Sequence, residues 1–158
     1  MLTPSDIIYC AAIKVGVDPL LLTAICKHES ALSPEAVRYE PHYKWLHFPR
    51  EHASRLSISY ETECALQSFS YGLPQVMGAV LREYGYQRPL QMVLLDQEVI
   101  CEIAARHIKS LQTRYSEEAE VIAAYNAGSA IKMESGMFKN QRYVDSVYFH
   151  LTQLRRLA

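Results

Sequence analysis

The chain has 158 residues, 49% of them hydrophobic, which is enough for one well-buried core and too few for two domains. Sixteen lysine and arginine residues against seventeen aspartate and glutamate residues give a formal net charge of −1. This balance supplies no basic field for nucleic acid or an anionic membrane surface. We therefore expect one domain, residues 1–158, that would bind a polymer only through a shaped groove.

The first two predicted helices have clear start and stop signals. Thr3 can cap a helix with Pro4 at its first position, and Gly16 would end that helix after residue 15. Asp18 and Pro19 then begin a second helix, which continues through an apolar stretch to about residue 30. We expect these two helices to pack into the core.

Residues 33–59 break the helical pattern, because three prolines interrupt a run of aromatic and basic side chains. We predict an irregular or partly helical insertion here. Short helices follow over residues 61–66 and 75–84, and Gly85 would end the second of them.

The remaining elements are also helical. Asp96 is placed to cap the clearest helix, whose apolar residues recur at three and four as far as Leu111. Ser116 would cap the next helix, Gly128 would end it, and Tyr143 would open a C-terminal helix. With no long alternating strand, the sequence predicts a mainly α fold, with at most a minor β or irregular insertion.

The N-terminal residues lack the basic segment and continuous apolar run of a signal peptide, and no stretch suits a membrane span. We expect synthesis in the cytoplasm and no stable membrane insertion. Cys10, Cys26, Cys64 and Cys101 are widely separated and include no Cys-x-x-Cys pair, so a disulfide framework is not expected.

Glu29 is a carboxylate in an apolar helical stretch. Leu22, Cys26 and Glu29 fall at i, i+4 and i+7, which places Glu29 on or beside the core-facing side of its helix, near the C-terminus. Burial and the negative end of the helix dipole would both raise the pKa of this carboxyl group. A carboxylic acid that is protonated near neutrality suits general-acid catalysis of glycoside cleavage. Taken alone, the residue is better explained as a helix glutamate that reaches solvent or pairs with Lys27 or His28, because most helix glutamates are solvated.

Three segments in order carry a family resemblance: Glu29-Ser30, residues 70–77 (SYGLPQVM) and residues 124–128 (AYNAG). They resemble the Glu-Ser, Gly-Leu-Met-Gln and Ala-Tyr-Asn-Ala-Gly segments of SLT-type lytic transglycosylases and the related goose-type lysozymes. The resemblance extends from about Ile13 to Tyr143. It implies a lysozyme-like helical fold and cleavage of the β-1,4 bond between N-acetylmuramic acid and N-acetylglucosamine in peptidoglycan.

The resemblance also implies how the bond is cleaved. Glu29 would protonate the leaving oxygen and then act as a base, so that the 6-hydroxyl of muramic acid closes a 1,6-anhydro ring. Residues 38–43 (RYEPHY) resemble the Arg-Phe-Glu-x-His stretch of phage N-acetylmuramidases. Glu40 therefore leaves a second function possible, that of a hydrolytic endolysin-like N-acetylmuramidase in which Glu40 would assist water. The alternative role of Glu40 is only to form an ion pair with Arg38 or Arg50.

The resemblance assigns further residues to the substrate groove. The expected substrate-binding residues are Ser70, Gln75, Met77, Tyr125, Asn126 and Tyr143. Gln75 would hydrogen-bond sugar groups, and Tyr125 would orient the substrate or the acid. Pro74 departs from the family's methionine and puts the local turn in doubt. Core packing is the rival role for Tyr143.

The aromatic residues between Tyr39 and Phe48 could stack on sugars or form a small core of the insertion, which is the interpretation we favour. We expect no cofactor and no metal, because Leu32 stands where the His-Glu-x-x-His zinc helix needs its second histidine.

A non-catalytic wall-binding or virion structural module of the same fold is a further alternative. The expected partner is the peptidoglycan glycan strand, and the missing export signal suggests a bacteriophage or prophage product, released by a holin or carried on the virion.

Overall fold

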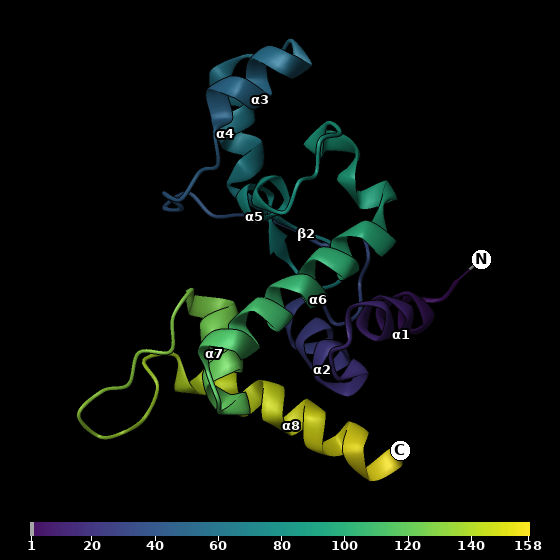
Figure 1. Cartoon of the computed structure of the whole chain (residues 1–158), viewed down its shortest axis with the longest axis vertical. Coiled ribbons are helices and arrows are strands. Elements are labelled where there is room, and N and C mark those ends of the chain that lie inside the picture. The colour runs from purple at the N-terminus through teal and green to yellow at the C-terminus, as the bar shows by residue number, and fades with distance from the viewer. Residues whose placement is uncertain (1) are drawn as a thin grey trace.

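A computed structural model describes residues 2–158. Within this range the chain is mainly helical, as the sequence predicts, with a small three-stranded sheet (Figure 1). The helices are α1 (Pro4–Val15), α2 (Pro19–Ser30), α3 (Pro49–Leu56), α4 (Tyr60–Gln67), α5 (Gly78–Glu83), the 3-10 helix η1 (Leu90–Leu95), α6 (Gln97–Arg114), α7 (Glu118–Ala127) and α8 (Gln141–Leu157). The strands are β1 (Val37–Tyr39), β2 (Phe69–Tyr71) and β3 (Val76–Met77).

The start signals of α1 and α2 act as expected. The Thr3 hydroxyl accepts a hydrogen bond from the Asp6 amide, and the Asp6 carboxylate accepts one from the Thr3 amide, which completes a capping box. Gly16 ends α1 in the left-handed conformation. The Asp18 carboxylate accepts a 2.8 Å hydrogen bond from the amide of Leu20 and caps α2.

Helix α6 lies at the centre of the fold, between α3, α4, α5 and the sheet on one side and α1, α2, α7 and α8 on the other (Figure 1). It packs against α1 and α7, while α2 packs against α8. The buried side chains of these helices, such as Leu22, Ile25, Ile108 and Leu151, belong to one hydrophobic cluster. Helix α2 is therefore held on several sides, and its C-terminal residues have fixed positions.

The sheet is antiparallel with strand order β1-β2-β3. Arg38 pairs with Ser70, which in turn pairs with Met77. The insertion of residues 33–59 contains β1 and α3, so it is partly helical as predicted and also supplies the edge strand of the sheet.

The predicted start of one helix is wrong. The expected helix over residues 75–84 begins only at Gly78, because Gln75 has a positive φ of 50° and Val76 and Met77 pair with β2 instead. Helix α5 can then approach α4 closely: a Cβ on Gly78 would lie 2.5 Å from the carbonyl oxygen of Leu66. Tertiary pairing thus overrides the helical spacing of the apolar residues.

At three other helices, either the starting residue or the expected capping hydrogen bond differs from expectation. Ser116 does not cap α7, whose N-cap position is Glu117 without a side-chain hydrogen bond. Asp96 stands at the N-cap of α6, yet its carboxylate accepts hydrogen bonds from Tyr86 and Arg88 rather than from the helix. Helix α8 begins at Gln141, two residues before Tyr143.

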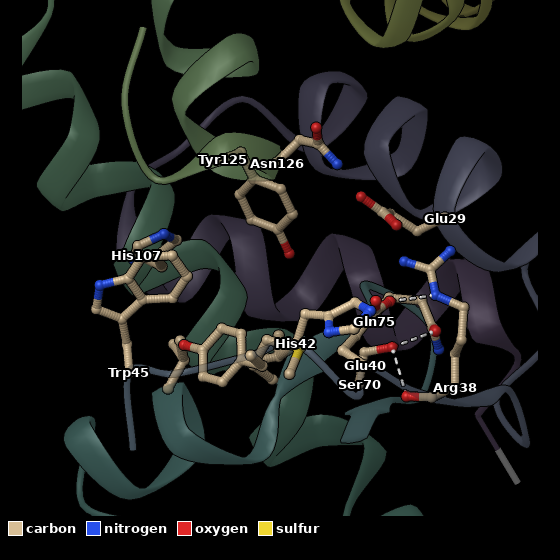
Figure 2. A pocket seen from close by; sticks show the side chains of 14 residues that line it. Glu29, Arg38, Glu40, His42, Trp45, Ser70, Gln75, His107, Tyr125 and Asn126 are labelled. Carbon is tan, nitrogen blue, oxygen red and sulfur yellow. Dashed lines mark hydrogen bonds and ion pairs between the residues drawn. The ribbon is translucent and has the colours of Figure 1, made fainter. Parts of the chain in front are cut away.

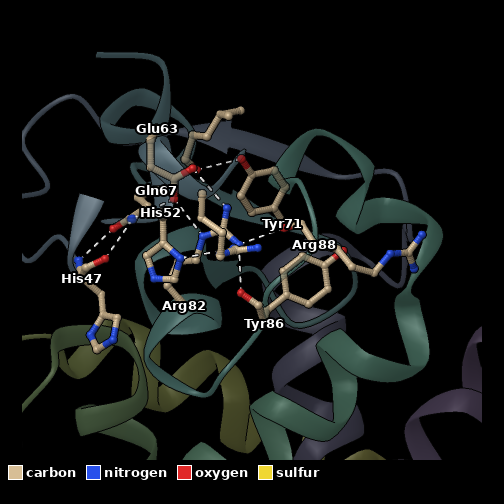
Figure 3. Close-up of polar contacts among 10 residues, drawn as sticks. His47, His52, Glu63, Gln67, Tyr71, Arg82, Tyr86 and Arg88 are labelled. Atoms are coloured by element: carbon tan, nitrogen blue, oxygen red, sulfur yellow. Dashed lines mark hydrogen bonds and ion pairs between the residues drawn. The ribbon is translucent and has the colours of Figure 1, made fainter. Parts of the chain in front are cut away.

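A fully buried ion pair joins α4 to α5 (Figure 3). The Arg82 guanidinium donates hydrogen bonds to both Glu63 oxygens, at 2.8 and 3.1 Å, and to the carbonyl oxygens of Tyr86 and Arg88. The Gln67 amide donates to Glu63 and to the carbonyl of His47, and its oxygen accepts from the His47 amide. This network therefore fixes the insertion backbone at His47 to two helices.

The four cysteines carry free thiols, and Cys26 and Cys101 are buried. Among residues 2–158, no helix is both long and apolar enough to cross a membrane.

Replacing Arg82 by methionine tests the buried network. Arg82→Met leaves the Glu63 carboxylate buried without its partner, and we expect the free energy of unfolding to fall by about 3–5 kcal/mol in chemical denaturation. Arg142→Met, at an exposed position on α8, is the matched control and should change it by less than about 0.5 kcal/mol. Equal stabilities of the two variants would show that the network does not hold this part of the fold.

Candidate active site

A groove with a volume of about 340 Å³ brings most of the predicted site residues together (Figure 2). Its lining includes Glu29 from α2, Glu40 from the insertion, Ser70, Gln75 and Met77 from the sheet region, and Tyr125 and Asn126 from α7. Tyr143 is buried behind the groove and contacts Glu29. Residues from three segments that are far apart in sequence therefore meet at one place.

Glu29 lies in the last turn of α2 and is partly buried. Burial raises the pKa of its carboxyl group, as the sequence predicts, and the nearby Glu40 adds to the increase. A hydrogen bond from Tyr143 and the positive charge of Arg38 act in the opposite direction, but burial has the largest effect. The net result is a carboxyl group that holds its proton to higher pH than an exposed glutamate.

Tyr143 is the side chain that orients Glu29. Its hydroxyl donates a 2.7 Å hydrogen bond to Glu29 Oε1, and it is buried, so it both packs in the core and contacts the acid. The His28 ring meets the Tyr143 ring edge to face at 4.7 Å, and His28 Nδ1 lies 2.7 Å from the Ser146 hydroxyl. Helix α8 thereby sets the position of the carboxyl group on α2.

Ser30 connects the end of α2 to the turn between β2 and β3. Its hydroxyl donates a 2.7 Å hydrogen bond to the carbonyl oxygen of Leu73. Gly72 starts this turn with a φ of 69°, which strains any residue with a Cβ, and a Cβ there would also lie 2.8 Å from Gln97 Oε1 and displace that side chain. The Glu-Ser and Gly-Leu segments of the sequence are thus held together by a direct contact.

The side-chain amide of Gln75 is bonded within the protein. Its Oε1 accepts a 2.8 Å hydrogen bond from Ser70, and its Nε2 donates to the carbonyl oxygens of Ala36 and Gly72 at 3.0 and 2.9 Å. Gln75 lines the groove while it closes the turn against β1. The contact of Gln75 with sugar stays a prediction, and the positioning of the turn is what its hydrogen bonds provide here.

Tyr125 donates a 2.9 Å hydrogen bond to the carbonyl oxygen of Pro74, so it is Tyr143 rather than Tyr125 that contacts the acid. Pro74 has no amide hydrogen to donate, but its carbonyl serves as the acceptor that fixes the Tyr125 phenol at the groove. Asn126 is exposed and accepts a hydrogen bond from the Asn140 amide.

Glu40 lies in the groove and forms an ion pair with Arg38. Both expected roles are therefore compatible with its position: it faces the same space as Glu29, and one of its oxygens is held by the Arg38 guanidinium. Arg50, the other expected partner, instead stacks on the Tyr60 ring at 4.5 Å.

Several residues that line the groove were not assigned to the site from sequence. Arg38, His42, Tyr43 and Val76 lie within the motif segments without having been given a role there. Trp45, Val80 and His107 lie outside those segments. The expectation that the insertion aromatics form a core of their own is wrong for Trp45, which is 75% exposed. One signal could have found Trp45: it lies between Pro41 and Pro49, in an aromatic segment. Because prolines interrupt a helix, this segment is not expected to have a helical face that could bury the indole.

The groove is suited to acid–base chemistry. It contains one carboxyl group with a raised pKa, one carboxylate that is ion-paired, and aromatic and amide side chains around them. Among residues 2–158, no group of three or more His, Cys, Asp or Glu side chains is arranged to hold a metal ion.

The contact between Ser30 and Leu73 yields a stability prediction. Ser30→Ala removes the only side-chain donor shown for the buried Leu73 carbonyl among the described residues, and should lower the free energy of unfolding by about 1–2 kcal/mol. Ser54→Ala, at an exposed helical position, should leave the denaturation midpoint nearly unchanged. A Ser30→Ala protein as stable as the wild type would contradict the structural role of this contact.

Comparison with known proteins agrees with this geometry. The Transglycosylase SLT domain family matches residues 6–143, which include every residue of the groove as well as Tyr143. No curated protein and no solved structure shows a significant match to the chain. Members of the matched family are lytic transglycosylases that cleave glycosidic bonds of peptidoglycan, and since the match covers most of its length, the chain belongs to the transglycosylase SLT domain family.

Proposed function

We propose that this lytic transglycosylase cleaves the bond between N-acetylmuramic acid and N-acetylglucosamine with Glu29 as the acid and then the base. The observation that carries the proposal is the environment of Glu29: a partly buried carboxyl group with a raised pKa that opens onto the groove. General-acid catalysis near neutral pH needs a carboxyl group in this state.

The reaction has two proton transfers at the same carboxyl group. Glu29 first donates its proton to the glycosidic oxygen, so that the bond to C1 of muramic acid breaks and N-acetylglucosamine leaves with a free hydroxyl. The Glu29 carboxylate then accepts the proton of the muramic acid 6-hydroxyl, while that oxygen bonds to C1. The product is a 1,6-anhydro ring, no water is consumed, and Glu29 is protonated again.

Tyr143 serves both halves of this cycle. Its hydrogen bond holds Glu29 Oε1 in one orientation, which leaves the other oxygen for proton transfer. The same bond stabilises the carboxylate after the first transfer, and it moderates the pKa increase that burial causes. The proposal thus assigns Tyr143 a positioning role.

Glu40 supports a second candidate, in which water replaces the 6-hydroxyl. The observation in its favour is that Glu40 lines the same groove as Glu29. A second carboxylate can activate water for hydrolysis and release a reducing-end muramic acid. The ion pair with Arg38 opposes this role, because it occupies one of the two Glu40 oxygens that would contact water.

Replacement of Glu29 by glutamine tests the acid directly. Glu29→Gln should reduce the release of soluble muropeptides from purified peptidoglycan at least about 100-fold. Its free energy of unfolding should stay close to that of the wild type, because the glutamine side-chain oxygen can accept the Tyr143 hydrogen bond in place of Glu29 Oε1. Glu134→Gln, at an exposed loop position, is the control and should retain activity.

Mass spectrometry of the products separates the candidates. Muropeptides with a 1,6-anhydro end from the wild type support the proposed reaction, whereas reducing-end muramic acid would identify hydrolysis and make Glu40→Gln the next variant. Full activity of Glu29→Gln would overturn the assignment of the acid.

Tyr143→Phe should shift the pH dependence of the reaction. Removal of the hydroxyl takes away a hydrogen bond that favours the charged carboxylate, so the pKa of Glu29 should rise further. Because the acid must be protonated, activity is lost as pH rises through this pKa, and the alkaline limb of the pH–rate profile should move to higher pH. The control Tyr9→Phe, at an exposed position on α1, should leave the limb in place. A shift of the Tyr143→Phe limb to lower pH would contradict this role.

A further inference from the structure

Trp45 is the single tryptophan of the chain and is unusually exposed for so large an apolar side chain. It is 75% accessible and lines the groove together with Tyr43. The two rings meet edge to face, with centroids 5.6 Å apart and an angle of 71° between their planes. This pair presents aromatic surface to the groove rather than to a core of the insertion.

The loop that carries these rings is held in place. Gln67 makes two hydrogen bonds with the backbone of His47, at 2.7 and 3.0 Å, and Gln67 is itself bonded to the buried pair of Glu63 and Arg82 (Figure 3). On the other side of the loop, the Glu40 amide donates to the carbonyl of Ser68 at 2.9 Å, and the Tyr43 amide donates to the carbonyl of Glu40 at 3.1 Å. The exposed indole therefore stands on a backbone fixed on both sides, which reduces the entropy lost when a ligand covers it.

Trp45 and Glu29 lie at opposite ends of the groove. Figure 2 shows Trp45 and His107 at one end, Glu29 and Arg38 at the other, and Tyr125 between them. A ligand that covers Trp45 while its scissile bond is at Glu29 must therefore extend along the groove. This excludes a single sugar as the ligand that occupies both ends.

We propose that Trp45 and Tyr43 form a platform on which a sugar ring of the glycan strand stacks, at a position beyond the two residues of the scissile bond. This inference rests on the proposed function and specifies the strand length that the groove selects. The apolar face of a pyranose ring fits an exposed aromatic face, and the Tyr43 hydroxyl and His42 at the same groove can bond its polar edge. Since the platform is away from the reacting atoms, it contributes to binding and leaves the chemical step alone.

The single tryptophan makes the proposal measurable without catalysis. The Glu29→Gln protein is titrated with soluble glycan strands of alternating N-acetylglucosamine and N-acetylmuramic acid, freed of peptide stems, in short and long defined lengths. Tryptophan emission is excited where tyrosine does not absorb. Long strands should produce a saturable change in emission, and calorimetry should give the same dissociation constant.

Variants of the insertion provide the control. In the Glu29→Gln protein, Trp45→Ala should weaken binding of long strands roughly tenfold and leave binding of short strands unchanged. In the active enzyme, Trp45→Ala should raise KM and preserve kcat. Phe48→Ala is the control, because Phe48 is another exposed aromatic residue of the insertion and packs on His47 outside the groove. It should leave both the affinity for long strands and KM unchanged.

The outcomes separate the platform from the proposed function. Two results would overturn the platform and leave Glu29 catalysis intact. One is binding of long strands in calorimetry without a change in tryptophan emission. The other is equal affinity for long strands in the Glu29→Gln protein with and without Trp45→Ala. An active wild type whose Glu29→Gln form binds no strand in calorimetry would also overturn the platform. Failure of the wild type to cleave peptidoglycan would instead contradict the proposed function.

Discussion

The hydrogen bond from Tyr143 to Glu29 is the contact on which the active site depends, because it joins the last helix of the chain to the carboxyl group at the end of α2. Burial of Glu29 favours its protonated form, and the Tyr143 hydroxyl limits that preference. A general acid must release its proton during the reaction, so neither full exposure nor uncompensated burial would serve. The packing of α2 against α8 is therefore part of the chemistry as well as of the fold.

Two polar arrangements in the sheet region complete the groove on the other side. Ser30 ties the end of α2 to the turn that contains Leu73, and Gln75 closes this turn through Ser70 and the carbonyl of Ala36. Farther along, the buried network around Arg82 fixes the insertion. Substrate-facing residues thus stand on segments whose backbones are bonded to buried partners, which is the condition for a preorganised site.

Local signals in the sequence predicted much of this structure. The caps at Thr3 and Asp18 and the raised pKa of Glu29 follow from neighbouring residues, and the structure confirms them. Short motifs placed most of the site residues, but their contacts could not be predicted: Gln75 takes a positive φ because β3 pairs with β2, and that pairing is not local. Trp45 had no motif, and its position depends on Gln67, a residue far along the chain.

The central claim is that Glu29 retains its proton above the pH at which an exposed glutamate loses it. An NMR titration of carbon-13 labelled glutamate side chains, assigned with Glu29→Gln, measures this pKa directly. The account predicts that Glu29 titrates at clearly higher pH than an exposed glutamate side chain ordinarily does. A Glu29 pKa equal to or below that of an exposed glutamate would contradict it.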